Sequence, residues 1–115
     1  MNGIVNVLAV VPAADFEASS DWYARFLGRP ADRKPMEGCS EWQLATGGAI
    51  QLIHAAGHAG NTQLTLAVED VDACAAQIAE RGLAVADPTD VPSGRFRLTS
   101  VTDPDGNSLV LAQEL

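Results

Sequence analysis

The 115-residue chain contains few of the residue types that mark a redox centre, a metal centre or a nucleic-acid surface. It has two cysteines, two histidines, one tyrosine and seven basic residues. Cys39 and Cys74 show no CxxC spacing, so two reduced thiols are favoured over a disulfide or a zinc framework. No apolar run reaches the length of a membrane span and no basic leader opens the chain, so we expect a cytoplasmic protein without a membrane partner.

Positive charge is also scarce. The seven Lys and Arg residues face fifteen Asp and Glu residues, which gives a net charge of −8. Nucleic-acid binding needs a cationic surface, so the composition argues against a nucleic-acid partner. The negative field of the protein favours cationic ligands, but a net charge of this size is also explained by solubility alone.

What the chain does contain is one pattern that occurs twice. An apolar strand at 4–12 leads to Asp15 as helix N-cap, an amphipathic helix and Gly28. A strand at 63–68 leads in the same way to Asp70, a second amphipathic helix and Gly82. The length suits a single domain, residues 1–115, with its own core. The duplication predicts two similar halves.

Each half is predicted to continue with three further strands. In the first half these lie at 31–36, 41–45 and 49–53, and in the second at 83–86, 96–102 and 108–112. The first strand, 4–12, is so apolar that we expect it to be covered on both faces. The resulting division is a βαβββ module at 3–54, a linker at 55–61 and a second βαβββ module at 62–113.

Four short stretches carry a resemblance to a known family: Asp15-Phe-Glu-Ala-Ser, Trp22-Tyr-Ala-Arg-Phe-Leu-Gly28, Val68-Glu-Asp-Val-Asp and Asp103-Pro-Asp-Gly-Asn107. Together they resemble the vicinal oxygen chelate superfamily of glyoxalases, bleomycin-resistance proteins and extradiol dioxygenases. The resemblance implies an α+β fold in which two paired βαβββ modules form a curled mixed sheet around a cavity. It also implies that a homodimer completes the cavity.

Enzymes of this family hold a divalent metal, and the resemblance assigns the four ligand positions to Leu8, Gln51, Gln63 and Val110. A slip of two residues in the first strand would replace Leu8 with Asn6. None of these side chains is an imidazole, thiolate or carboxylate, so they make a poor metal cage. His54 and His58 fall at a strand end and in the linker. We therefore expect no metal and no other cofactor.

Strand alternation predicts which side chains line the cavity. The leucine-rich faces of the strands belong against the helices, so the opposite, glutamine-bearing faces should look into the cavity. The predicted ligand-binding set is Leu8, Trp42, Gln51, Gln63, Thr65, Ser108 and Val110. Two alternatives stay open. Trp42 shares a face with Leu44, so it could equally be a core residue instead of a ligand contact. The glutamines could form hydrogen bonds with each other and with ordered water instead of with a ligand.

The predicted function is metal-independent binding or sequestration of a small molecule, resembling the bleomycin-resistance branch, with a cationic antibiotic or metabolite as ligand. No catalytic residue is predicted. One alternative is a metal-dependent glyoxalase-type lyase or dioxygenase with displaced ligands. It needs a histidine or carboxylate in the cavity, which we do not expect from alternation. Another alternative is a dimerising regulatory or structural module with a collapsed cavity.

Overall fold

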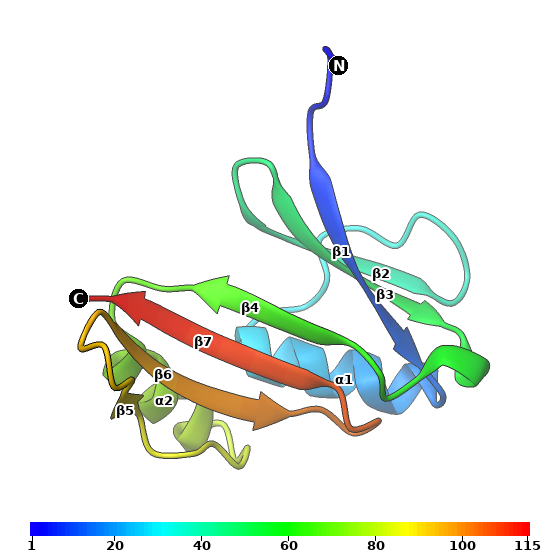
Figure 1. Cartoon of the computed structure of the whole chain (residues 1–115). Helices are drawn as coiled ribbons and strands as arrows, with labels where there is room; N and C mark the ends of the chain where they lie inside the picture. The colour runs from blue at the N-terminus through cyan, green and yellow to red at the C-terminus, as the bar shows by residue number, and fades with distance from the viewer.

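The computed structural model describes residues 1–115 and contains two β-sheets and two α-helices (Figure 1). The elements follow the order β1 (Val7–Ala13), α1 (Phe16–Leu27), β2 (Cys39–Ala45), β3 (Gly48–His54), a 3-10 turn (Ala56–His58), β4 (Gln63–Ala67), α2 (Val71–Glu80), β5 (Thr89–Asp90), β6 (Phe96–Thr102) and β7 (Ser108–Glu114). The first sheet has the order β1-β3-β2 and the second the order β4-β7-β6-β5. The predicted α+β fold is confirmed, with two mixed sheets that do not close into a barrel.

Two of the predicted strands are wrong. The stretch 31–36 contributes only one bridge, between Arg33 and Glu41. No strand forms at 83–86, and the two-residue strand β5 pairs with β6 in its place. Pro35 lies inside the first stretch, and a proline cannot donate to a strand ladder.

The expectation that the first strand is covered on both faces is also wrong. β1 forms the edge of its sheet, parallel to β3, and Val7, Leu8 and Val10 are exposed. Only its C-terminal end is buried, at Val11 and Ala13. The apolar sequence of β1 therefore does not reflect burial within one chain.

The predicted helix boundaries are confirmed by the hydrogen bonds at the helix ends. The side chain of Asp15 accepts from the amide of Ala18, and that of Asp70 accepts from the amide of Ala73. Gly28 ends α1 with a left-handed φ of 78°. Neither helix is long and apolar enough to cross a membrane.

The two helix C-termini also hold each other. The guanidinium of Arg81 donates to the carbonyl of Phe26, and the guanidinium of Arg25 donates to the carbonyl of Arg81. An arginine at the end of each helix thus donates to a free carbonyl at the C-terminus of the other helix, where the helix dipole favours positive charge. A Cβ at Gly28 would lie 2.6 Å from the Arg81 guanidinium and would displace it, and the positive φ of Gly28 independently favours glycine.

The turn between β6 and β7 holds α1 through a buried carboxylate. Asp103 is 4% exposed, and its Oδ2 accepts from the hydroxyl of Tyr23 at 2.7 Å and from the side-chain amide of Asn107 at 2.8 Å. Its Oδ1 accepts from the backbone amides of Asp105 and Asn107. This aspartate therefore closes its own turn and anchors the first helix at the same time.

Two other turn residues extend the contact to the start of the chain. Asp105 accepts from the backbone amide of Ala14 and from the hydroxyl of Ser19. Asn107, completely buried, accepts from the amide of Thr62 and donates to the carbonyl of Pro12. The turn thus fixes the ends of β1 and β4 and the start of α1.

The β2–β3 hairpin contains a bulge that decides which way its side chains face. Ala45 lies opposite Gly48, but Gln43 lies opposite Ala49, so Leu44 is an extra residue. Beyond the bulge, Trp42 pairs with Ile50 and Glu41 pairs with Gln51. Without the extra residue every side chain from Glu41 to Gln43 would face the opposite side of the sheet.

The side chain of Gln43 stabilises this bulge. Its amide nitrogen lies within hydrogen-bond distance of the carbonyls of Ala45 and Gly48, at 2.9 and 3.2 Å. The same amide exchanges two hydrogen bonds of 3.0 Å with the side chain of Asn6, just before β1. The two N–H groups of this amide are thus shared among Asn6 and the carbonyls on either side of the hairpin turn, which ties the bulge to the start of the chain.

The sole tyrosine gives an alkaline test of the Asp103 contact. Burial, and next the hydrogen bond to Asp103, hold the pKa of Tyr23 well above its ordinary value of about 10. Because the folded-state pKa is the higher one, folding is favoured below about pH 10 and is increasingly opposed above it. We expect the phenolate absorbance to rise only together with the loss of circular dichroism. Titration of the tyrosine near pH 10 in the folded protein would contradict the contact. Tyr23→Phe should abolish the absorbance change and, because it takes a donor from the buried Asp103 carboxylate, lower the free energy of unfolding at neutral pH.

The bulge can be tested by shortening Gln43. Gln43→Ala removes the donor to two carbonyls and should lower the free energy of unfolding in urea by about 1 kcal/mol. Gln63→Ala is the matched control, because Gln63 is also an exposed strand glutamine but its side chain makes no hydrogen bond within the chain. Its effect should stay below about 0.5 kcal/mol. Equal losses in the two variants would show that Gln43 does not stabilise the bulge.

Candidate functional site

Each sheet packs one face on the helices and leaves the other face open. On the helix side of β3, Ile50 and Leu52 are buried, and on that of β7 Leu109 and Leu111 are buried. The opposite sides carry polar residues among apolar ones, as alternation predicts. The open faces are the surfaces on which the predicted ligand-binding residues were expected.

Six of the seven predicted residues do lie on these open faces. Gln51 and Leu8 belong to the open face of the first sheet. The other four form two pairs on the second sheet, where Gln63 lies opposite Ser108 and Thr65 lies opposite Val110. The structure thus brings the residues together in two groups, one on each sheet. No hydrogen bond joins Gln51 to Gln63 within the chain, so the two glutamines do not satisfy each other there.

The seventh residue, Trp42, lies in the core. Its side chain is fully buried, its ring centroid is 6.1 Å from that of Tyr23, and its indole N–H donates to the carbonyl of Arg29 at 3.0 Å. The bulge at Leu44 puts it on the Ile50 side of the sheet. Of the two roles left open for Trp42, the structure shows the core role, and a stacking surface on the open face is ruled out for this conformation.

Glu41, which the sequence did not identify as a candidate site residue, lies on the open face of the first sheet. It lies opposite Gln51 on the open face and is 8% exposed. Its Oε2 accepts from the side-chain amide of Gln51 at 2.7 Å, and its Oε1 lies 3.6 Å from Nε of Arg33. The expectation that alternation puts no carboxylate beside the glutamines was wrong. In a regular hairpin with a turn at Thr46-Gly47, Glu41 would face the helix side of the sheet. Its position on the open face therefore depends on the bulge, which the sequence pattern does not indicate.

The charge of Glu41 affects the pKa of Cys39, its neighbour on the same face of β2. Burial, followed by the negative charge of Glu41, raises the pKa of the Cys39 thiol, while Arg33 opposes the shift. Cys39 is therefore a protonated, buried thiol and not a reactive nucleophile.

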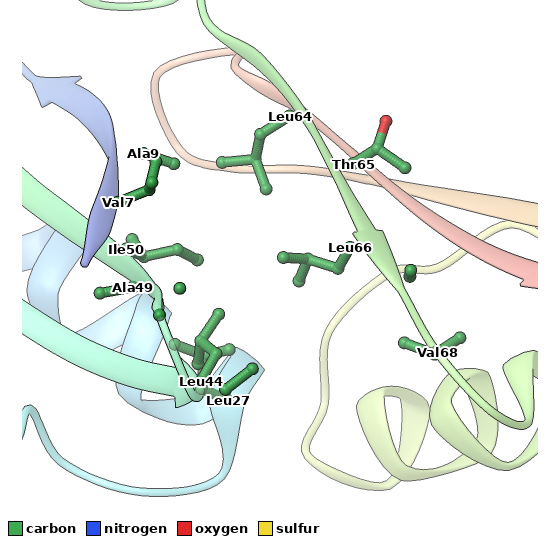
Figure 2. Close-up of a pocket in the computed structure, with 14 residues that line it drawn as sticks. Val7, Ala9, Leu27, Leu44, Ala49, Ile50, Leu64, Thr65, Leu66 and Val68 are labelled. Carbon is green, nitrogen blue, oxygen red and sulfur yellow. The ribbon is translucent and has the colours of Figure 1, made fainter. Parts of the chain in front are cut away.

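The structure contains an apolar groove of about 600 Å³ between the two sheets (Figure 2). Its walls come from β1, β3 and the end of α1 on one side and from β4 on the other. They include Val7, Ala9, Ile50, Leu27, Leu64 and Leu66. In Figure 2 the side chain of Thr65 points away from the groove. On β4 the groove is lined by the helix-facing side chains of Leu64, Leu66 and Val68, and Thr65 is the one predicted ligand-binding residue that also borders it.

Two free strand edges border this groove. β1 is the last strand of the first sheet and β4 the last strand of the second. Each presents unpaired backbone groups and exposed or half-buried apolar side chains, a combination that folded proteins normally cover.

The family's metal positions do not fit a metal in this chain. Leu8 and Val110 carry no donor atom, and Gln51 and Gln63 offer only neutral amide oxygens on different sheets. No group of three or more His, Cys, Asp and Glu side chains is placed to hold an ion. His54 and His58 are both exposed.

Comparisons with known proteins were made on the sequence and on the fold. A glyoxalase/bleomycin resistance protein from Catenulispora acidiphila DSM 44928 is 32% identical, with a TM-score of 0.89, over 96% of this chain and 99% of that one. TnmS3, an antibiotic binding protein from Streptomyces sp. CB03234, is 28% identical, with a TM-score of 0.82, over 100% of this chain and 99% of that one. A bleomycin-binding protein complexed with bleomycin shares the fold, with a TM-score of 0.79 at 19% identity over 96% of this chain and 98% of that one.

A search among curated proteins found no significant match. The model of the Glyoxalase/Bleomycin resistance protein/Dioxygenase superfamily matches residues 4–111, nearly the whole chain. The family resemblance inferred from the helix and turn motifs is therefore confirmed, and the chain belongs to the Glyoxalase/Bleomycin resistance protein/Dioxygenase superfamily.

Proposed function

We propose that this protein binds and sequesters a small molecule without a metal and without catalysing a reaction, and that it does so as a homodimer. The observation that carries the proposal is the chemistry of the open faces. At the positions where enzymes of the family hold their metal they offer only amides and apolar side chains: Leu8, Gln51, Gln63 and Val110. The hydroxyls of Ser108 and Thr65 lie opposite Gln63 and Val110, and a single carboxylate, Glu41, lies opposite Gln51. Such groups suit recognition of a ligand rather than bond breaking.

Two of the similar structures support a binding role. TnmS3 is described as an antibiotic binding protein, and another solved protein of this fold is complexed with bleomycin. Both cover nearly the whole of this chain and are nearly wholly covered by it. A cationic antibiotic or metabolite fits the net charge of −8, which would attract a positively charged ligand through the long-range field.

The apolar groove supports the homodimer. A second copy related by a twofold axis would present its own β1 and β4 to the same groove, so that the free edge of β1 in one chain meets the free edge of β4 in the other. This arrangement covers both edges at once. It would also bring the first-sheet open face of one chain, with Leu8 and Gln51, towards the second-sheet open face of its partner.

The dimer can be tested with two substitutions on neighbouring residues of β4. Both residues border the groove, but Leu66 points its side chain into it, whereas the side chain of Thr65 points away (Figure 2). Leu66→Lys places a charge in the groove and should convert the dimer to a monomer in sedimentation velocity. Thr65→Lys should leave the dimer intact and weaken ligand binding. A monomeric wild-type protein, or a Leu66→Lys variant that stays dimeric, would contradict the proposed interface.

The binding role can be tested with chelator-treated protein and a panel of cationic and neutral antibiotics that includes metal-free bleomycin. We expect at least one cationic member to raise the unfolding midpoint, since a ligand that binds only the native state stabilises it. The bound compound should be recovered chemically unchanged after long incubation. Gln51→Leu and Gln63→Leu should each weaken binding about tenfold, because a polar group of the ligand then loses its partner.

Metal analysis of the same preparation separates the binding role from the enzyme alternative. Stoichiometric metal that survives chelation, or conversion of a bound compound into a product, would overturn the proposal in favour of a lyase or dioxygenase. Absence of any binding in the panel would instead favour the structural or regulatory module.

A further inference from the structure

Three residues form a row across the open face of the first sheet. Glu41 on β2, Gln51 on β3 and Val10 on β1 lie directly opposite one another in the strand register. Adjacent strands are about 4.8 Å apart, so the row runs for about 10 Å from a carboxylate, past an amide, to an exposed apolar side chain. This is the length of a small amphipathic cation with a planar apolar body.

The carboxylate at the head of the row is incompletely paired. Glu41 is 8% exposed, yet it has one hydrogen bond, from Gln51 to Oε2. Its Oε1 is 3.6 Å from Nε of Arg33, beyond hydrogen-bond distance. A nearly buried carboxylate gains from a closer, charge-assisted donor.

Arg33 is held in place by its backbone but not by its side chain. The amide of Arg33 donates to the carbonyl of Glu41, and the amide of Glu41 donates to the carbonyl of Arg33. The side chain is 71% exposed and makes no hydrogen bond. The guanidinium can therefore leave Glu41 by side-chain rotation alone, while the backbone bridge stays closed.

We propose that Glu41 anchors the positively charged group of the ligand and that Arg33 is the internal counter-ion which this group displaces. The preferred ligand class is an amidinium, guanidinium or primary ammonium attached to an apolar body. The cation binds Glu41, Gln51 holds the carboxylate in place, and the apolar body lies along Val10. The inference rests on the proposed binding function and adds the chemical group that is recognised.

The test compares two probes of the same shape, benzamidine and benzamide, by protein-observed NMR titration. Benzamidine carries a planar cation that matches a carboxylate, and benzamide is neutral. In the wild-type protein we expect benzamidine to bind about tenfold more tightly than benzamide. Glu41→Gln should reduce this ratio to about one. Glu80→Gln, which removes one negative charge from an exposed helix position, should leave the ratio unchanged.

Arg33→Gln gives a result that a purely structural role of Glu41 would not produce. Removing the internal counter-ion should strengthen benzamidine binding by up to about fivefold, the size expected for a weak, exposed ion pair, and leave benzamide binding unchanged. It also keeps the inference testable if Glu41→Gln fails to fold. Weaker benzamidine binding in Arg33→Gln would overturn the displacement.

The outcomes separate this inference from the proposed function. Equal binding of the two probes to the wild-type protein overturns the anchor and leaves the binding role standing. Binding of neither probe, while an antibiotic of the panel is still held, also overturns the anchor. If no antibiotic and neither probe binds, the proposed function fails and the anchor fails with it.

Discussion

The buried carboxylate of Asp103 is the interaction on which the placement of the site depends. It is satisfied from several directions at once: by the amides of its own turn, by Asn107 and by the hydroxyl of Tyr23 on the first helix. A buried carboxylate that loses its donors is costly, so the turn and the helix are stable mainly together. Because the turn belongs to the second sheet and the helix packs on the first, this contact fixes the two sheets relative to each other. The reciprocal contacts of Arg25 and Arg81 hold the other ends of the helices.

In the proposed dimer, each chain supplies one part of the binding site. The open faces with Gln51 and Gln63 lie on different sheets, and the helices pack against the opposite faces, α1 on β3 and α2 on β6 and β7. The groove bordered by β1 and β4 is apolar and leaves two strand edges unpaired. A second copy would cover the groove and supply the missing face. Under this proposal, the stability of the dimer and the binding of ligand depend on the same geometry.

Much of the fold was predictable because it depends on local chemistry. Asp15 and Asp70 cap the helices, Gly28 ends the first helix with a positive φ, and strand alternation placed Gln51, Gln63, Thr65, Ser108 and Val110 on the open faces. The failures have physical causes. Pro35 interrupts the strand predicted at 31–36, and the apolar sequence of β1 suggested burial that one chain does not provide. The site residue that was missed, Glu41, could not be found by alternation alone, because alternation within a strand does not fix the register between strands.

The sequence by itself determined the helices, most of the strands, the family and the absence of strong metal ligands at the four family positions, since each depends on the identity and spacing of residues. Only the tertiary structure decided which of Glu41 and Trp42 reaches the open face. The single extra residue Leu44, stabilised by the amide of Gln43, turns Trp42 into the core and Glu41 towards Gln51. Side chains alternate with a period of two, so one inserted residue exchanges the two faces of a strand.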